Sequence, residues 1–273
     1  MKILGISRER IFSPGKVRED AAILNAVLRI LSHTGHQTHA RSAESFTNGI
    51  EGADLILSMA QSGRVMSILE EATESGIPVI NAVAAVRNCY RNAQVTILAE
   101  TSIPMPNSRI ASIRAIEKDS GAFDKGDYWL KRGDFHALCP NDVIRIGSRD
   151  DLSRALAHFR VQGVDQVLVQ AHVAGPCAKF YGIGTGPDSL FKVFQPASGE
   201  EITTRAGRLS ETARAAAAYI GLEIYGGDAV ISADGTWVLV DLNDWPTFSL
   251  CRKTAAQAIV EYLRCKYAMT GEM

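Results

Sequence analysis

The sequence predicts an α/β fold that continues into α+β units, and three observations lead to this prediction. Short apolar runs alternate along the chain with amphipathic stretches of helical period, which is typical of strands and helices that alternate in sequence. The chain has 273 residues, 46% of them hydrophobic, so it exceeds one average domain and can bury a sizeable core. No internal repeat interrupts the pattern. We therefore expect two or three compact units.

The first unit, over residues 1–86, is expected to be a Rossmann-like α/β domain with a parallel sheet. Its apolar runs are short and nearly continuous, as in strands that are buried on both faces. Its helical stretches carry apolar residues at helical spacing, and a glycine follows each of them as an expected stop. The predicted elements are a strand at 2–6, a helix at 18–34, strands at 39–42 and 53–58, a helix at 63–75 and a strand at 78–81.

Two further units are expected to have α+β structure, over residues 87–165 and 166–273. In the last unit ADGT separates two apolar runs, and Asp-Gly suits the positive-φ positions of a tight hairpin turn. The elements predicted for the second unit are a helix at 88–100, an extended stretch at 102–110, strands at 128–131 and 142–146, and a helix at 151–162. Those of the third are strands at 166–170, 178–184 and 189–194, a helix at 209–220, hairpin strands at 225–232 and 236–241, and a helix at 254–266.

Composition and charge exclude several classes of protein. There are 29 Lys and Arg against 30 Asp and Glu, and the formal net charge of -1 gives no electrostatic basis for binding nucleic acid or an anionic membrane. No apolar run approaches the roughly 18 residues that span a bilayer, and the start lacks a secretory signal, so we expect a soluble cytoplasmic protein. The cysteines show no paired or zinc-like spacing, which predicts reduced thiols and no structural metal; they are Cys89, Cys139, Cys177, Cys251 and Cys265.

The most informative segment is the predicted hairpin within residues 221–248. Asp241 and Asn243 are two positions apart on one strand, so their side chains leave the same face, and the hairpin can bring Asp228 beside them. Carboxylate and amide oxygens suit Mg²⁺, which commonly bridges nucleotide phosphates. The alternative is that Asp241 and Asn243 only end a strand and accept bonds from turn amides.

Three lysines within or at the ends of predicted strands are candidates for binding nucleotide phosphates, namely Lys131, Lys179 and Lys192. A strand lysine can place its ammonium on phosphate oxygens while its stem packs on apolar surface. The alternative for each is an edge-strand lysine that only reaches solvent. Imidazole is a common general base, but a structural or pocket-lining role is the favoured interpretation of His172.

The order of these motifs resembles the ATP-grasp superfamily, and within it the group of ribosomal-protein glutamate ligases and inositol-trisphosphate 5/6-kinases. The resemblance covers most of residues 78–250. The family has a stretch that runs from an Asn through a basic residue to a helix and a proline, and the similar segment here is PVINAVAAVRNCYRNAQVTILAETSIPMP. YWLKRGD resembles its phosphate-contacting strand, VLVQAHVAGPCAKFYGIG its adenine linker, and YGGDAVISADGTWVLVDLNDWPTF its metal-binding end.

The resemblance implies an ATP-grasp fold, in which two α+β subdomains clasp ATP, and it implies a role for individual residues. The magnesium ligands correspond to Asp228, Asp241 and Asn243. Lys131 corresponds to the phosphate lysine, Arg91 to a second nucleotide-contacting basic residue, and Lys179 to a basic residue near the transferred phosphate. The adenine linker corresponds to Gln170, Ala171, His172 and Val173. The sequence departs from the family at two places: Ala171 replaces an acidic residue, and the loop GDFHALCPN lacks the usual lid glycines.

The acceptor of the phosphoryl group is expected between the N-terminal domain and the residues that follow the metal motif. Helix N-termini and arginines suit carboxylates and phosphates. Arg252 is the catalytic candidate there, together with Lys179. The other anion-binding candidates, each of which could be an ordinary surface group, are Arg8, Arg10, Lys16, Ser62, Gly63, Arg64 and Lys253.

The resemblance implies that ATP and Mg²⁺ are the cofactors, with two ions expected and Mn²⁺ as the alternative metal. We favour a ligase that activates a carboxylate as an acyl phosphate for attack by an amine or thiol, because ligation is the commoner chemistry of the superfamily. The near-neutral charge also does not indicate a polyphosphate substrate.

Two alternatives stay open. The first is a kinase for a small molecule of the inositol phosphate kind, and the second is a nucleotide-binding module without turnover, which the substitution at Ala171 and the glycine-poor lid suggest. The expected partners are ATP and a small-molecule carboxylate or phosphorylated acceptor, with a peptide as a further option. We expect no nucleic acid and no membrane partner, and a homo-oligomer stays open.

Overall fold

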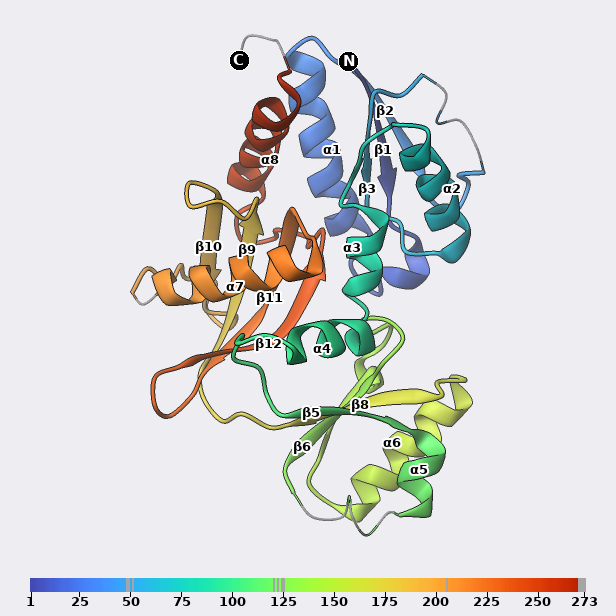
Figure 1. Ribbon diagram of the computed structural model, residues 1–273, viewed down its shortest axis with the longest axis vertical. Helices are drawn as coiled ribbons and strands as arrows, with labels where there is room; N and C mark the ends of the chain where they lie inside the picture. Colours follow the sequence, from blue (N-terminus) through green and yellow to red (C-terminus); the bar gives the residue numbers. More distant parts are fainter. Residues whose placement is uncertain are drawn as a thin grey trace.

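The chain forms three four-stranded sheets that follow one another along the long axis of the molecule (Figure 1). The computed structural model describes residues 1–47, 50, 52–119, 121, 123, 126–204 and 206–269. The N-terminal sheet lies at one end, the sheet that contains β5 and β8 lies at the other, and the third sheet lies between them. Mixed α/β and α+β architecture is therefore confirmed. None of the described helices combines the length and the apolar character that crossing a bilayer requires.

The N-terminal sheet is parallel, with strand order β2-β1-β3-β4. Successive residues of β1 point to opposite faces, so that Ile3 packs in the cluster on α1 and α8 while Leu4 packs in the cluster on α2. Both faces are thus buried, as the continuous apolar runs predict. The elements are β1 (Lys2–Ser7), η1 (Arg10–Phe12), α1 (Val17–His33), β2 (Gln37–Ser42), β3 (Leu55–Ser58), α2 (Gly63–Glu74) and β4 (Val79–Ile80).

The second sheet is antiparallel, with order β5-β8-β6-β7, and its core is built by residues of α5, α6 and the sheet strands. The expected third unit began at residue 166, but the strand that starts there, β8, pairs with β5 and β6. Sheet pairing therefore places it with the second unit. The elements are α3 (Val83–Asn88), α4 (Arg91–Ala99), β5 (Ser108–Ser112), α5 (Ile113–Lys118), β6 (Tyr128–Arg132), η3 (Pro140–Asp142), β7 (Val143–Ile146), α6 (Arg149–Val161) and β8 (Gln166–Ala171).

One boundary in this unit was predicted wrongly, and two short helices were not predicted. The helix expected over residues 88–100 begins only at Arg91, as α4, and a separate helix, α3, ends at Asn88. Tyr90 separates them, because it has an extended backbone at φ -63° and ψ 132° and donates its hydroxyl to Gln61 O at 3.2 Å. The extended stretch expected up to residue 110 is followed by a helix, α5, which was not predicted. Its N-cap Ser112 accepts a hydrogen bond from Ala115 N, the usual role of serine at this position.

The third sheet has order β10-β9-β11-β12 and is antiparallel. One face packs on α7, and the other meets α8. The second hairpin strand extends to residue 244 rather than 241, so that Asn243 lies within the strand and not beyond it. The elements are β9 (Cys177–Ile183), β10 (Leu190–Phe194), α7 (Ala206–Ile220), β11 (Ile224–Ile231), β12 (Trp237–Asp244) and α8 (Arg252–Tyr267).

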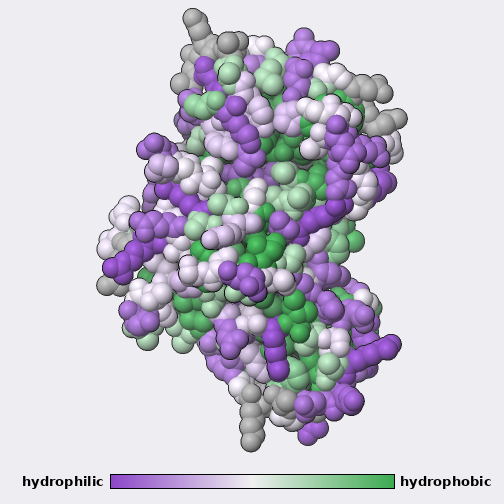
Figure 2. Space-filling view, viewed as in Figure 1, coloured by the Kyte–Doolittle hydropathy of each residue, from purple (hydrophilic) through white to green (hydrophobic). Residues whose placement is uncertain are grey.

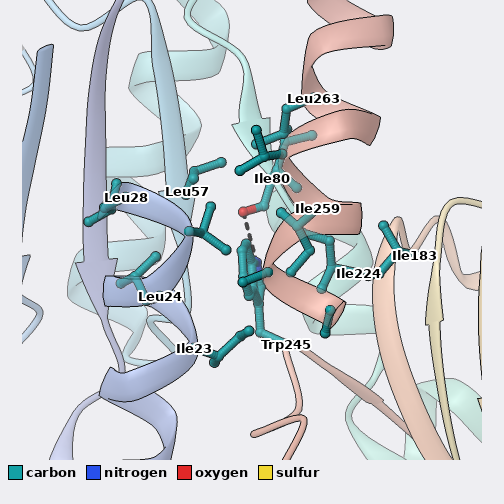
Figure 3. Packing of buried hydrophobic residues seen from close by; sticks show 14 of the residues in the cluster. Ile23, Leu24, Leu28, Leu57, Ile80, Ile183, Ile224, Trp245, Ile259 and Leu263 are labelled. Atoms are coloured by element: carbon teal, nitrogen blue, oxygen red, sulfur yellow. Dashed lines mark hydrogen bonds between the residues drawn. The ribbon is translucent and has the colours of Figure 1, made fainter. Parts of the chain in front are cut away.

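A shared core joins the first and third units, and Trp245 lies at its centre (Figure 3). Its indole Nε1 donates to Ile80 O at 3.0 Å, and residues of α1 and α8 surround the ring. Trp245 has φ 35°, a left-handed conformation that costs about 1–2 kcal/mol. Burial of its roughly 150–250 Å² contributes about 4–6 kcal/mol at 25 cal/mol per Å², so the packing outweighs the strain.

Seen from the direction of Figure 1, the surface of the molecule is mostly hydrophilic, and hydrophobic residues are visible mainly along its middle (Figure 2).

Asn81, directly after β4, adds polar contacts to the join between the first and third units. Its side chain donates to Ile224 O at 2.8 Å and accepts from Glu223 N and Ile224 N at 2.9 Å each. The end of the N-terminal sheet is therefore fixed to the start of β11, the strand that carries Asp228.

Candidate active site

The β11–β12 hairpin brings the three predicted metal ligands to one face of the third sheet. Asp228 and Asp241 are direct cross-strand partners, and Asn243 faces Gly226 two pairs further along. Residues in opposite register share a face, so all three side chains leave the sheet in the same direction. The geometry predicted from the hairpin is therefore confirmed, and the metal-binding role stays a prediction.

Two glycines allow the strands to approach closely beside these acids. A Cβ at Gly227 would lie 2.1 Å from Asp241 O and 2.5 Å from a ring carbon of Phe180, and one at Gly226 would lie 2.8 Å from Phe180 O. Any larger residue would force the hairpin apart. The two glycines before Asp228 thus fix its position against Asp241.

Two cations offset the repulsion between the opposed carboxylates. Lys179 Nζ lies 3.0 Å from Asp228 Oδ1, and Arg91 Nη2 lies 3.6 Å from Asp241 Oδ2. Burial alone would lower the pKa of Lys179, but Asp228 outweighs burial and the pKa is raised. The side chain of Asp228 is 44% exposed and that of Asp241 is 18% exposed, so both stay accessible from the cavities described below.

Lys131 is buried on β6, and its ammonium forms no ion pair within 4 Å among the residues that the structure describes. Burial lowers its pKa to about 8, with Asp241 and Asp228 opposing the shift and Arg91 adding to it. A desolvated ammonium without a fixed partner interacts strongly with an anion that enters the site. The ammonium of Lys131 can therefore form an ion pair with a negatively charged ligand.

Arg91 begins α4 and is buried, with 6% of its surface exposed. Its Nη1 donates to Arg132 O and to Phe135 O, both at 3.2 Å, while Nε has no hydrogen-bond partner among the described residues. The break between α3 and α4 places this guanidinium at the start of a helix, where it reaches the loop after β6. A single helix over residues 88–100 would place Arg91 inside the helix, so that prediction did not give this position.

The first of two cavities, which we call the apolar cavity, has a volume of about 350 Å³. Apolar side chains from five strands and the segment before β5 form much of its wall, and two of the predicted basic residues, two of the predicted acidic residues and the linker complete it. Its lining residues are Arg91, Pro106, Trp129, Lys131, Val143, Gln170, Ala171, His172, Val173, Cys177, Asp228, Ala229, Val230, Val240 and Asp241.

The linker at the end of β8 has most of its amides occupied. Ala171 N donates to Asn107 O at 2.8 Å and His172 N donates to Asp127 O at 3.0 Å, whereas Val173 N donates to no group in the described part of the chain. His172 Nδ1 lies 3.1 Å from Trp129 Nε1, which supports the pocket-lining interpretation of this histidine. Gln170 donates to Ser108 Oγ at 3.3 Å, and its buried Oε1 has no partner among the described residues.

The second cavity, which we call the polar cavity, has a volume of about 600 Å³ and lies between the loop after β1 and the segment after β12. Arg91, Asp228 and Asp241 line both cavities. The other lining residues of the polar cavity are Arg8, Phe12, Ser13, Pro14, Gly15, Lys16, Glu19, Asp20, His136, Ala137, Lys179, Tyr181, Asn243, Asp244, Pro246, Thr247 and Ser249.

Several predicted residues are not brought into the site. Lys192 lines neither cavity and pairs with Glu201 at 2.7 Å, and Arg252 in the first turn of α8 also lines neither. Arg10 pairs with exposed Glu44, and Arg64 donates to backbone carbonyls that include Ala43 O. Strand position alone made Lys192 a candidate, but the neighbouring turn supplies its counter-ion. The roles predicted for Lys192 and Arg252 find no support in this geometry.

Arg8 lines the polar cavity, yet each nitrogen of its guanidinium already contacts an oxygen atom of the protein. It donates to Met59 O, Asp244 O and Trp245 O and lies 3.4 Å from Asp20 Oδ2. The two carboxylates that it approaches, Asp20 and Asp244, are buried. Arg8 therefore fixes the floor of the cavity rather than presenting a free anion-binding group.

Asp244 lines the polar cavity and is a residue that the sequence reasoning did not identify, whereas His136 of the glycine-poor loop, a candidate contact of a shortened lid, lines the same cavity. Burial raises the pKa of Asp244, with Arg8, His136 and Gln61 opposing the shift. Burial also lowers the pKa of His136, whose Nε2 lies 2.9 Å from Phe12 O. Asp244 follows the metal motif directly, but strand alternation points it away from Asp241 and Asn243, so the motif gave no signal for it.

The donor set of the hairpin fits a hard divalent cation. Two carboxylates and one amide oxygen supply only oxygen ligands, and the accessible Asp228 leaves room for water or phosphate oxygens. Nitrogen or sulfur ligands, which zinc prefers, are absent from these three residues. The fit to Mg²⁺ is thus chemical and does not depend on the resemblance.

The comparisons with known proteins bear on the fold. The sequence matches no protein-family model and no curated protein. Among solved structures, the ATP-grasp RimK domain protein from Sphaerobacter thermophilus is 18% identical with a TM-score of 0.75, over 96% of this chain and 99% of that chain. D-alanine–D-alanine ligase from Bacillus anthracis, also solved with ATP, is 13% identical with a TM-score of 0.75, over 98% and 99%.

A third solved structure, the ATP-grasp ligase PsnB with a precursor peptide and AMPPNP, is 15% identical with a TM-score of 0.65, over 96% of each chain. All three similarities extend over nearly the whole chain on both sides. The fold is therefore the ATP-grasp fold, as the sequence resemblance predicted.

Proposed function

We propose that this protein is an ATP-dependent ligase that activates a carboxylate as an acyl phosphate for attack by an amine, with a thiol as the alternative nucleophile. Its ATP-grasp fold supports this proposal, because the solved structures that share the fold include ligases. The observation on which it rests is that Arg91, Asp228 and Asp241 line both cavities. A phosphoryl group placed at these residues would face a nucleotide on one side and an acceptor on the other.

In this proposal the apolar cavity holds the nucleoside. Its valines, Pro106 and Trp129 suit the flat faces of adenine. The unpartnered Oε1 of Gln170 would accept a hydrogen bond from the exocyclic amino group, and the amide of Val173 would donate to a ring nitrogen. The amides of Ala171 and His172 are used within the protein, so the linker would act through Gln170 and Val173.

Charged residues at the junction of the cavities would hold the polyphosphate. Lys131 and Arg91 would bind its oxygens, and Lys179, which lies beside Asp228 and lines only the polar cavity, would contact the group in transfer. Asp228, Asp241 and Asn243 would hold Mg²⁺, which when bound neutralises phosphate charge. Whether one or two ions bind is left to experiment.

The polar cavity would hold the acceptor. Transfer of the terminal phosphoryl group of ATP to a carboxylate oxygen yields ADP and an acyl phosphate, and attack of an amine on the carbonyl carbon then forms an amide and releases phosphate and a proton. The cavity lining carries the basic residues Arg8, Lys16, Arg91 and Lys179 and the acidic residues Glu19, Asp20, Asp228, Asp241 and Asp244. This mixture lacks the cationic excess that a polyphosphate acceptor needs, so it favours a ligase over an inositol phosphate kinase.

Hydroxylamine as a general amine tests the proposal without knowledge of the natural nucleophile. The full-length protein is incubated with ATP, Mg²⁺, hydroxylamine and a panel of amino acids and dipeptides, and ADP and acyl hydroxamates are measured by mass spectrometry. We expect at least one carboxylate to give ADP and its hydroxamate in equal amounts. With that carboxylate labelled with ¹⁸O, we expect one label in the released phosphate, because its oxygen bridges to phosphorus in an acyl phosphate.

Other outcomes would identify the alternatives. A phosphorylated hydroxyl compound without hydroxamate would show a kinase. Tight binding of ATP without ADP formation in the presence of any acceptor would show a nucleotide-binding module.

A further inference from the structure

A cysteine, an aspartate and a histidine meet outside the two cavities, at the end of the loop between β6 and β7. His158 Nε2 lies 3.7 Å from Cys139 Sγ and 3.0 Å from Asp142 Oδ1, and the three ligand atoms all lie within 4.8 Å of one another. Cys139 and His158 are partly exposed, whereas Asp142 is fully buried. Neither the proposed ligase reaction nor the ATP-grasp resemblance uses these residues.

Local structure holds two of the three groups rigidly. Cys139 is the N-cap of η3 and forms a reciprocal capping box with Asp142, in which each side chain accepts from the backbone amide of the other. Asp142 Oδ2 accepts from Leu138 N at 2.8 Å and from Cys139 N at 3.2 Å, and Arg132 Nη1 lies 3.6 Å away. Asp142 Oδ1 is therefore the oxygen directed at His158.

The buried carboxylate of Asp142 is surrounded by hydrogen-bond donors and one cation. Leu138 N, Cys139 N and Arg132 lie beside Oδ2, and His158 Nε2 lies beside Oδ1. Thiol, imidazole and carboxylate groups that lie this close together are ligand types that transition-metal cations bind.

Two of the three distances between the ligand atoms are close to those of tetrahedral coordination. With Zn–S near 2.3 Å and Zn–N and Zn–O near 2.0 Å, tetrahedral angles separate sulfur from nitrogen by about 3.5 Å and nitrogen from oxygen by about 3.3 Å. The observed 3.7 Å and 3.0 Å differ from these values by a few tenths of an ångström. The third pair, Cys139 Sγ and Asp142 Oδ1, lies within 4.8 Å, so a side-chain rotation of Cys139 toward Asp142 would complete the site, and the exposed side of Cys139 and His158 leaves a fourth position for water.

We propose that Cys139 Sγ, His158 Nε2 and Asp142 Oδ1 bind a transition-metal ion of the Zn²⁺ type. Binding forms a metal–thiolate bond and releases the thiol proton to solvent, and His158 carries its remaining proton on Nδ1. The site does not depend on the proposed function. It differs from the oxygen-only set of Asp228, Asp241 and Asn243. The proposal departs from the expectation of no structural metal, which rested on cysteine spacing and gave no sign that His158 on α6 approaches the loop.

The metal would fasten the loop over residues 133–142 to α6. The same loop reaches the polar cavity and the N-terminal domain through Phe135 O, which accepts from Arg91 Nη1, and through His136 Nε2, which lies 2.9 Å from Phe12 O. An ion at the base of the loop would thus restrain the segment that corresponds to the nucleotide lid in the resemblance to the ATP-grasp superfamily. The loop lacks several lid glycines, which is consistent with a restrained rather than a freely closing segment.

Cobalt provides a direct test, because a Co²⁺–thiolate bond gives an intense near-ultraviolet charge-transfer band. The full-length protein is stripped with EDTA, held in excess Mg²⁺ to occupy oxygen sites, and titrated with Co²⁺. We expect one equivalent to bind with the thiolate band, and Zn²⁺ to displace it. Cys139→Ser should abolish the band, and His158→Ala should weaken binding on the order of 100-fold or more, as expected for the loss of a group that tunes the metal.

Controls separate this site from other thiols. Cys265→Ser removes an exposed cysteine on α8 and should leave the band unchanged. Circular dichroism of the metal-free variants checks that they fold. In the wild type, Zn²⁺ should also slow amide hydrogen exchange in residues 133–142, a measurement that needs no variant. Absence of the thiolate band in the wild type, its persistence in Cys139→Ser, or exchange in this loop that Zn²⁺ does not change would overturn the proposal.

Discussion

The two cavities share Arg91, Asp228 and Asp241 but are built in different ways. Strands β6, β8, β11 and β12 supply most of the wall of the apolar cavity. Most of the wall of the polar cavity comes from the loop after β1, the start of α1, the loop after β6 and the segment after β12. Strand positions are fixed by hydrogen-bonded register, and loop positions depend on contacts between distant parts of the chain. The apolar cavity therefore suits a constant ligand, and the polar cavity is where substrate choice would lie.

The largest expected effect comes from a shared residue. Asp241→Asn should lower the rate of ADP formation by about 10³-fold, because one carboxylate at the junction would serve both ligands. Steady-state kinetics should show a change in the parameters of ATP and of the acceptor together. The matched control is Asp150→Asn, which alters an exposed aspartate on α6. A change confined to the ATP parameters would mean that the cavities act separately.

Arg8→Met tests whether the floor of the polar cavity is structural. The change removes the partner of the buried carboxylates Asp20 and Asp244, and should lower the free energy of unfolding by about 3–5 kcal/mol in urea denaturation. Arg10→Met is the control two residues away, where the side chain is 80% exposed and pairs with Glu44. It should change stability by less than about 1 kcal/mol. Equal effects of the two variants would contradict a structural role for Arg8.

Lys131→Met should stabilise the ligand-free protein while it impairs the apolar cavity. The pKa of Lys131 is lowered from 10.5 to about 8 by burial, so the unfolded chain binds the proton more tightly between these values. The cost of the buried charge, about 3 kcal/mol, is therefore complete below pH 8 and disappears as the pH rises toward 10.5. Urea denaturation at pH 7 should show the variant more stable, and this advantage should shrink at high pH.

The same variant should lower kcat/KM for ATP by about 10²-fold and leave the KM of the acceptor unchanged, because Lys131 lines only the apolar cavity. Lys118→Met, at an exposed position of α5, is the matched control. If Lys131→Met raised the acceptor KM instead, the assignment of the two cavities would be reversed.

Lys16→Ala should have the smallest effect. This exposed lysine lines only the polar cavity, and loss of one charged contact should raise the acceptor KM roughly tenfold with no change in the KM of ATP. Arg18→Ala, two residues along and also exposed, lies outside the cavity lining and should leave both values unchanged. Steady-state kinetics with the acceptor found by hydroxamate trapping provides the measurement.

The sequence predicted the apolar cavity better than the polar one. Period-two alternation and a tight turn placed Asp228, Asp241 and Asn243 on one face, and these are local rules. Asp244 and the residues around Gly15 meet only because α8 and Trp245 join the first unit to the third. The sequence analysis expected an acceptor site between these two parts of the chain, with Arg8 and Lys16 among its candidates. No local pattern encodes the contacts of Asp244, so this part of the floor of the polar cavity was not predicted.

Lys192 shows that position on a strand is not enough to predict which lysines belong to the site. It lies opposite Tyr181 on the face that also carries Lys179, and the pattern cannot tell the two lysines apart. The counter-ions separate them, since Lys179 meets Asp228 from β11 whereas Lys192 meets Glu201 beyond its own strand. The bend at Tyr90, which places Arg91, depends on the contact of its hydroxyl with Gln61 and was likewise outside the reach of helical periodicity.

The packing of α8 on α1 has a consequence for biosynthesis. Ile23, Leu24 and Leu28 of α1 share one buried cluster with Ile259 and Leu263 of α8, and Trp245 completes it (Figure 3). The ribosome makes α1 early and α8 only after both later sheets. Until α8 emerges, this face of α1 has no native cover, and the nascent chain exposes an apolar surface to which chaperones bind. The native cover of the first unit is thus completed only once α8 has been made.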